Sequence, residues 1–188
     1  MGPGEIRRII AITEAMERFW KRAHGWAPRA AAKLMADARL DRQTSFVHTL
    51  YDYLKPFSER EAEARQILGY VTLRSLCEGI LRLFFAVWLE AYSRDVDAPV
   101  DRNKSIVAPE NVRFERLIAL YSQKGSAEYE TFLRRVQERG NAIHHFTDRQ
   151  IGSQDELIAD IAQFLEFLLA VNSSLPYPDD MSIIPYFA

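Results

Sequence analysis

Apolar residues recur every three or four positions along most of the chain, which is the pattern of helices that bury one face. The first such run, from Glu5 to Arg22, places Ile6 and Ile9 at helical spacing. No segment shows the polar and apolar alternation that is typical of a strand. In approximate bounds, the pattern predicts helices over 5–22, 28–54 (with or without a break near residue 41), 59–93, 110–123, 126–146 and 154–172.

The segment 59–93 is apolar over most of its circumference, so we expect it to be the central helix of a bundle. Ser58 and Glu61 form a capping-box pattern that opens it, and Ser153 and Glu156 open the last helix in the same way. The chain is therefore divided into an N-terminal helical extension (1–57), a helical core (58–172) and an irregular hydrophobic C-terminal tail (173–188). The predicted fold class is an all-α bundle of about six helices.

Composition narrows the classes of protein that fit. The chain has 188 residues, 48% of them hydrophobic and 27% charged, which are the values of an ordinary globular domain. The net charge of −2 supplies no global basic field that would attract nucleic acid. Cys77 is the single cysteine, so an intrachain disulfide is excluded, and its apolar surroundings indicate a buried hydrophobic role.

Two further segments bear on where the protein is located and whether it contacts a membrane. The first residues lack the basic region and apolar run of a secretory leader, which together with the single cysteine favours a cytoplasmic protein. The most apolar stretch, 80–89, contains Arg82 and is about ten residues long, whereas a bilayer span needs about 18. We therefore expect no membrane contact.

The spacing of the histidines supports neither a metal site nor a Ser–His–Asp catalytic triad. The four histidines are His24, His48, His144 and His145, and none forms a pair with the spacing of a metal site on one helix face. No Gly-x-Ser-x-Gly motif is present. We expect no metal and no cofactor.

The most informative stretch is Arg139-Gly140-Asn141-Ala142-Ile143-His144, at the end of one helix and ahead of another long one. It resembles the Arg-x4–6-His signature of the HEPN superfamily of helical domains. Arg18–His24 and Arg42–His48 also fit the signature, with five intervening residues, but only the match at 139–144 follows a long apolar central helix, a loop and a shorter helix, and precedes a capped amphipathic helix. That order, over about 58–172, is similar to the HEPN core.

The resemblance implies a metal-independent endoribonuclease that works as a homodimer, in the role of a toxin or defence component with a protein antitoxin. His144 would act as acid and base, Arg139 would bind the phosphate, and Asn141 would assist. Histidine titrates near neutral pH, and arginine binds phosphate oxygens through two parallel donors. The reaction would attack the phosphate from the ribose 2′-hydroxyl, leaving a 2′,3′-cyclic phosphate, so the substrate would be RNA.

One departure from the family pattern leaves other functions open. Active members often carry Asn, Asp or His directly after the arginine, where this chain has Gly140, with Asn141 one position later. The first alternative is a non-catalytic HEPN-like module that binds RNA or a protein partner. The second is a helical bundle without a nucleic-acid role, in which the C-terminal tail mediates assembly. His145 is an alternative to His144 as the acting histidine.

Helical geometry constrains how the motif could work. At about 100° per residue, Arg139 and His144 lie about 70° to either side of an apolar stripe, so one straight helix does not bring them together. The stripe consists of Tyr129, Phe132, Leu133, Val136, Gly140 and Ile143. If it packed against a two-fold mate, Arg139 of one chain would approach His144 of the other. A local basic patch is expected from Arg134, Arg135, Arg139 and Arg149.

Simpler structural roles remain for each candidate residue. Arg139 could pair with Glu138, Glu166 or another surface acid, and His144 could be a half-buried histidine bonded to a carbonyl. Glu78 is a further site candidate that could orient Arg139, but Arg74, Glu78 and Arg82 are also spaced for an ion-pair ladder. The three tryptophans, Trp20, Trp26 and Trp88, are expected in the core.

Overall fold

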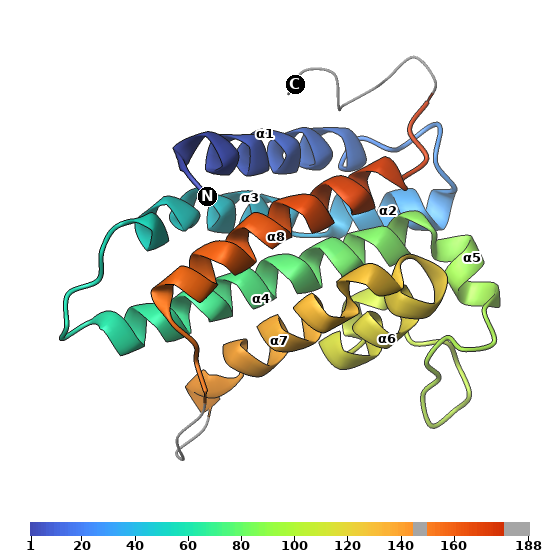
Figure 1. Ribbon diagram of the computed structural model, residues 1–188. Coiled ribbons are helices and arrows are strands. Elements are labelled where there is room, and N and C mark those ends of the chain that lie inside the picture. The colour runs from blue at the N-terminus through green and yellow to red at the C-terminus, as the bar shows by residue number, and fades with distance from the viewer. Residues whose placement is uncertain (145–149, 179–188) are drawn as a thin grey trace.

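The computed structural model describes residues 1–144 and 150–178. Within these ranges the protein is all-helical, with no strand, as the sequence predicts (Figure 1). The α-helices are α1 (Pro3–Trp20), α2 (Arg29–Asp37), α3 (Leu40–His48), α4 (Ala62–Val87), α5 (Leu89–Arg94), α6 (Phe114–Lys124), α7 (Glu130–Gly140) and α8 (Gln154–Ser173). Four short 3₁₀ turns join them: η1 (Thr49–Leu54), η2 (Pro109–Asn111), η3 (Ala127–Tyr129) and η4 (Ala142–His144).

The described part of the chain therefore has eight α-helices where about six were expected, because two predicted helices are interrupted. Ala38 has extended backbone angles (φ −67°, ψ 144°), which separates α2 from α3. Trp88 leaves the helical region (φ −88°, ψ 29°), which separates α4 from α5. Neither break carries a glycine or a proline, the residues that usually mark such interruptions.

Helix α4 runs through the middle of the bundle, as its apolar circumference predicts. The shorter helices α2, α3, α6 and α7 and the long helix α8 pack around it (Figure 1). Leu73, Leu76 and Cys77 are fully buried along its length. Burial raises the pKa of the Cys77 thiol well above its ordinary value, so this residue stays a neutral apolar side chain.

The first three helices share one hydrophobic core with the other five. Ile6, Ile9 and Met16 of α1 belong to the same buried cluster as Leu73 of α4 and Leu168 of α8. The segment 1–57 therefore completes the bundle rather than projecting from it. No helix in the described ranges has the length and apolar character needed to cross a bilayer.

The tryptophan prediction is correct for one residue of three. Trp20 is fully buried, but Trp26 is 43% exposed and Trp88 is 38% exposed. Trp20 donates its indole N–H to the hydroxyl of Tyr177 (3.0 Å), which in turn donates to the side-chain oxygen of Asn172 (2.6 Å). The start of the C-terminal tail therefore lies against the end of α1, while residues 179–188 lie outside the described part of the chain.

Candidate functional site

The apolar stripe of α7 packs inside its own chain. Phe132, Leu133 and Val136 are buried. Gly140 lies so close to α4 that a Cβ atom there would be 2.8 Å from the Cβ of Arg74 and 2.9 Å from the carbonyl oxygen of Tyr70. The stripe is thus occupied by α4 and is not free to face a two-fold mate, which corrects the geometry expected above. Ile143, expected at the end of the stripe, is exposed instead.

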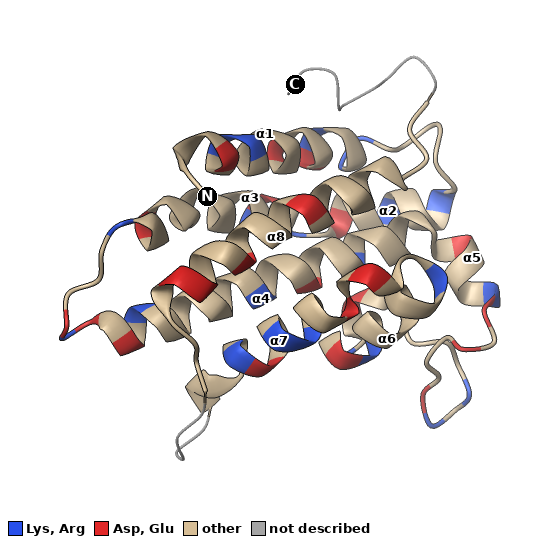
Figure 2. Ribbon diagram, in the orientation of Figure 1, with Lys and Arg blue, Asp and Glu red and all other residues tan. Residues whose placement is uncertain are grey.

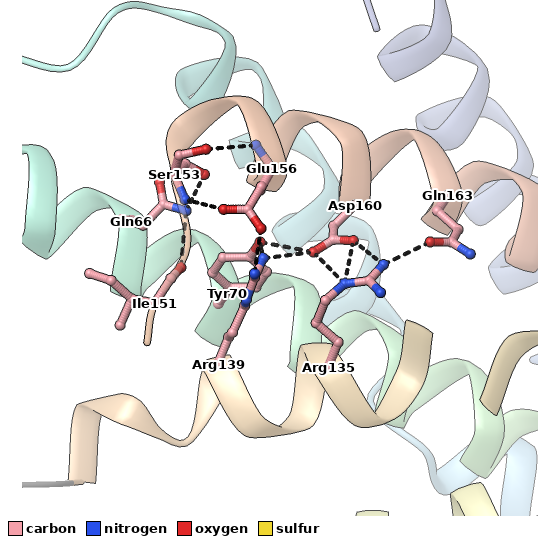
Figure 3. Close-up of polar contacts among 9 residues, drawn as sticks. All are labelled: Gln66, Tyr70, Arg135, Arg139, Ile151, Ser153, Glu156, Asp160 and Gln163. Atoms are coloured by element: carbon pink, nitrogen blue, oxygen red, sulfur yellow. Dashed lines mark hydrogen bonds and ion pairs between the residues drawn. The ribbon is translucent and has the colours of Figure 1, made fainter. Parts of the chain in front are cut away.

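Arg139 is held on two sides by carboxylates. Its Nη2 donates to Oε1 of Glu156 (2.6 Å), and its Nη1 donates to the hydroxyl of Tyr70 (2.5 Å) and lies 3.5 Å from Oδ2 of Asp160 (Figure 3). The guanidinium carbon also lies 5.2 Å from the centre of the Tyr70 ring. The Arg139 side chain is only 13% exposed. The simpler prediction of an ion pair for Arg139 is therefore met, but by Glu156 and Asp160 rather than by Glu138 or Glu166.

Asp160 is the buried centre of this network. Its side chain is 4% exposed and accepts hydrogen bonds from Nε (3.0 Å) and Nη2 (2.6 Å) of Arg135 and from the Tyr70 hydroxyl (2.8 Å). Arg135 also donates to Oε1 of Gln163 (2.9 Å). A buried carboxylate is tolerated only when it is paired and hydrogen-bonded in this way. Burial and the neighbouring Asp160 carboxylate raise the pKa of Tyr70, which keeps its hydroxyl a donor.

Glu156 links Arg139 to the start of α8. Its Oε1 accepts from Arg139, while its Oε2 accepts from the backbone N–H of Ser153 (2.8 Å). The Ser153 hydroxyl accepts from the Glu156 backbone N–H (3.2 Å), so the predicted capping box is formed. The guanidinium of Arg139 and the N–H of Ser153 hold the pKa of Glu156 below its ordinary value.

The same contacts fix the chain just before α8. Gly152 has a positive φ of 75°, and a Cβ atom there would be 2.7 Å from Nη1 of Arg139. Gln66 of α4 donates its side-chain N–H to the carbonyl oxygens of Ser153 (2.7 Å) and Ile151 (3.3 Å). Arg139 and Gln66 therefore clamp residues 151–153 between α7 and α4.

Burial of a guanidinium lowers its pKa, but the hydrogen bonds with Glu156 and Tyr70 more than offset this, and the pKa of Arg139 is raised. Arg139 is therefore charged, and its charge is balanced within the chain. The observed contacts of this network hold α4, α7 and α8 together at one point.

The other motif residues lie beyond this network. His144 ends η4 and is exposed, and its backbone N–H donates to the carbonyl of Asn141 (3.1 Å). Asn141 caps α7, donating its own N–H to the carbonyls of Gln137 and Glu138. Among the residues that the structure describes, no hydrogen bond or ion pair joins His144 to Arg139. His145 and Arg149 lie outside the described residues.

Glu78 takes part in the ion-pair ladder. It lies 2.7 Å from Nη2 of Arg82 and 3.6 Å from Nη2 of Arg74 on the same helix. The carboxylates that contact Arg139 are instead Glu156 and Asp160. The contacts formed by Glu78 thus match the simpler alternative, and Arg139 is oriented by other residues.

The three described arginines of the expected basic patch are each neutralised by an acid. Arg134 pairs with Glu130 (2.7 Å), Arg135 with Asp160 and Arg139 with Glu156. Figure 2 accordingly shows both basic and acidic residues on α7, and acidic residues on α8. This part of the surface is electrically balanced rather than basic.

Sequence reasoning missed Tyr70, Asp160 and the role of Glu156. A signal was present: Arg135 and Arg139 are four residues apart, and so are Glu156 and Asp160, so each pair lies on one face of its helix. The two pairs match when α7 and α8 run antiparallel, with Arg135 opposite Asp160 and Arg139 opposite Glu156. Tyr70 offered no such signal, because nothing in its local pattern separates it from the apolar core of α4.

Within the described residues, no group of three or more His, Cys, Asp or Glu side chains is placed to hold a metal ion. Comparison with known proteins adds no assignment: no family model matches the chain, and no curated protein and no solved structure matches it either.

Proposed function

We propose that the protein is a non-catalytic helical module that binds a protein partner, and that Arg139 is a structural clamp within it. The observation that carries this proposal is the closure of the Arg139 guanidinium by Glu156, Asp160 and Tyr70. A phosphate-binding arginine must offer a pair of free donors to its ligand. In this protein both terminal nitrogens of Arg139, Nη1 and Nη2, already donate to partners from α4 and α8.

Opening the site would be costly. Displacing Asp160 from Arg139 breaks a largely buried ion pair and leaves charge without a partner. Asp160 is held by Arg135 as well, so it cannot move away without breaking a second pair. These contacts favour a permanent structural role for Arg139 over a reversible ligand site.

A protein partner is favoured over RNA by the charge and the exposed apolar residues. The arginines of α7 are paired with acids, so they add little attraction for a polyanion. The loop between α5 and η2 exposes Val96 (95%), Val100 (57%) and Ile106 (40%). Asp101 orders this loop by accepting from the backbone N–H groups of Asn103 and Ser105. Val100 and Ile106 are neighbours in an isolated antiparallel bridge, and adjoining exposed apolar side chains are typical of protein contact sites.

The experiment incubates the full chain with structured RNA in EDTA and measures cleavage and fluorescence anisotropy at about 150 mM salt. We expect neither cleavage nor saturable binding. For the protein contact, a photocrosslinking residue replaces Val100 in cells, and Leu68, which is 50% exposed on α4, serves as the matched position. A discrete adduct from position 100 but not from position 68 supports the proposal. Metal-independent RNA cleavage contradicts it.

A second candidate is the HEPN-like endoribonuclease acting as a homodimer, and one observation favours it. Glu156, the outer partner of Arg139, is 52% exposed, and His144 is exposed as well. An RNA phosphate could therefore take the place of the Glu156 carboxylate. His144 would then remove the 2′-hydroxyl proton, the 2′-oxygen would attack phosphorus, and the 5′-oxygen would leave with a proton.

Loss of cleavage in Arg139→Ala alone does not establish this candidate, because that change also removes the clamp on residues 151–153. Glu156→Gln is sharper: glutamine retains the capping box but not the negative charge. The nuclease predicts faster cleavage in Glu156→Gln, loss in His144→Ala, and no change in the control Asp155→Asn, which removes an exposed acid one residue away. Recovery of activity on mixing two inactive single mutants would indicate a shared site.

A further inference from the structure

A pocket of about 520 Å³ lies at the end of the bundle where α4 gives way to α5, remote from Arg139 in the fold. Five aromatic side chains line it, from α4, α5, α6 and the break between α4 and α5: Phe84, Phe85, Trp88, Tyr92 and Tyr121. We call it the aromatic pocket. Its volume falls in the range of about 300–1,000 Å³ that small-molecule sites occupy.

The sequence explains why this space is open. Trp88 leaves the helical conformation, so the chain turns away from α4 before α5 begins. Ala91 of α5 and Ala170 of α8 line the pocket but are too small to fill it. Gly125 also lines it, and a Cβ atom there would be 2.6 Å from the Tyr121 ring, so only glycine lets the ring lie in this position.

Two polar side chains of the aromatic pocket, Lys124 and Tyr121, offer hydrogen-bond donors that the protein does not use. The Lys124 ammonium has three N–H donors, and Asp95 and Asp97 each occupy one at 3.1 Å. The Tyr121 hydroxyl forms no hydrogen bond with any residue in the described ranges, although the side chain is only 2% exposed. Burial raises the pKa of Tyr121 to about 12, so its hydroxyl remains a donor at neutral pH.

The charged side chains at the pocket are already paired with one another. Asp95 and Lys124 are the charged residues that line it, and they lie 3.1 Å apart as an ion pair. Lys124 is also paired with Asp97 (3.1 Å), so an anionic ligand would meet an ammonium that two carboxylates already neutralise, and a cationic ligand would have to displace Lys124 from both; either is unfavourable in an apolar pocket. The complementary ligand is therefore uncharged, apolar over most of its surface and equipped with an acceptor.

We propose that the aromatic pocket binds a small uncharged apolar molecule that carries one carbonyl acceptor, with Tyr121 donating to that carbonyl. Aromatic walls and a single fixed donor are the usual means by which such pockets orient a ligand. This site shares no residue with the Arg139 network, so its test is independent of the proposed function. A bound molecule would also reach the break between α4 and α5, since Trp88 lines the pocket.

The test uses prodan, an uncharged naphthalene ketone whose emission shifts to the blue in an apolar site, titrated against the full chain. We expect saturable binding with a dissociation constant below about 100 µM. Tyr121→Phe removes only the hydroxyl, so we expect prodan affinity to fall about fivefold, the effect of one neutral hydrogen bond. For the prodan analogue without its ketone group, Tyr121→Phe should lower the affinity less than about twofold.

Two variants locate the probe, and one serves as a matched control. Ala170→Phe fills the pocket from α8, and Ala91→Phe fills it from an exposed position of α5 where folding is not at risk. Both should abolish binding while the circular dichroism spectrum is retained. Tyr129→Phe should leave affinity unchanged, because Tyr129 belongs to the same aromatic cluster but does not line the pocket.

Four outcomes would overturn the proposal. The first is the absence of saturable prodan binding, and the second is binding that survives both Ala170→Phe and Ala91→Phe. The third is an equal loss of affinity for prodan and for its analogue without the ketone in Tyr121→Phe. If only a chain lacking residues 179–188 binds prodan, the occupant is the chain's own tail, and the small-molecule proposal is wrong.

Discussion

Gly152 lies directly against the guanidinium of Arg139: a Cβ atom at position 152 would be 2.7 Å from Nη1 and 2.8 Å from Cζ. The positive φ of 75° at Gly152 is what turns the backbone toward the arginine before α8 begins. The contact couples the end of α7 to the start of α8 without any side chain from the loop itself.

Gly152→Ala should therefore lower the free energy of unfolding by about 2–3 kcal/mol, combining about 1 kcal/mol of backbone strain with the displacement of Arg139. Gly25→Ala is the matched control, because Gly25 also has a positive φ (97°) but has nothing within 4 Å of its Cβ position. Urea unfolding measures both. Equal losses in the two variants would show that the Arg139 contact adds nothing.

Glu156→Gln should lower stability by about 0.5–1 kcal/mol at pH 7, a value discounted because the Glu156 side chain is about half exposed. The pKa of Glu156 is depressed in the folded state, so its contribution is present above the ordinary glutamate pKa of 4.5. That contribution is lost as the pH falls through the lower folded-state pKa. The stability difference between wild type and Glu156→Gln should therefore disappear in acid.

The matched control for that pH series is Asp155→Asn, since Asp155 is exposed and lies in the same helical turn. Its stability difference from wild type should stay small across the titration. A Glu156→Gln difference that persists unchanged under acidic conditions would mean that the ion pair with Arg139 is not its source.

Asp160→Asn should be the most damaging single change in the network. It leaves the partly buried guanidinium of Arg135 without its carboxylate partner, and breaking a buried pair from one side costs about 3–5 kcal/mol. Asp155→Asn again supplies the exposed comparison. Denaturant midpoints at constant slope measure the effect, and a loss as small as that of the exposed control would contradict the buried position of Asp160.

Gly140→Ala should destabilise the monomer by about 1–3 kcal/mol, because the added Cβ would overlap the Arg74 side chain and the Tyr70 carbonyl. The oligomeric state, measured by light scattering, should not change. If Gly140 instead lay in an interface between two chains, the substitution would shift the distribution of species and leave monomer unfolding unaffected.

Local patterns predicted the helices, the central position of α4 and the capping box at Ser153, because each depends on neighbours within one or two turns. They failed where side chains from three helices meet. The partners of Arg139 come from 69 and 17 residues away, and helical spacing does not report which distant face will oppose it. The break that the sequence left open near residue 41 lies at Ala38, whereas the break at Trp88 was not predicted, since neither glycine nor proline marks it.

The stripe of α7 shows the same limit from another side. Its apolar residues correctly indicated a packing face, but periodicity does not say whether that face meets another part of the same chain or a second copy. The structure assigns it to α4. The shared-site geometry of the nuclease and dimer hypotheses needs this face to meet a second copy. Both hypotheses remain predictions, which the RNA and mixing experiments test.

The matched spacing of Arg135 and Arg139 with Asp160 and Glu156 also sets a mechanical rule for the bundle. Sliding α7 along α8 by one turn, about 5.4 Å, would put Arg135 beside Glu156 and strand the enclosed Asp160 carboxylate. The two ion pairs thus fix the register of α7 against α8. A conformational change that involves α7 and α8 is therefore expected to rotate or locally unfold these helices rather than to shift one along the other by a whole turn.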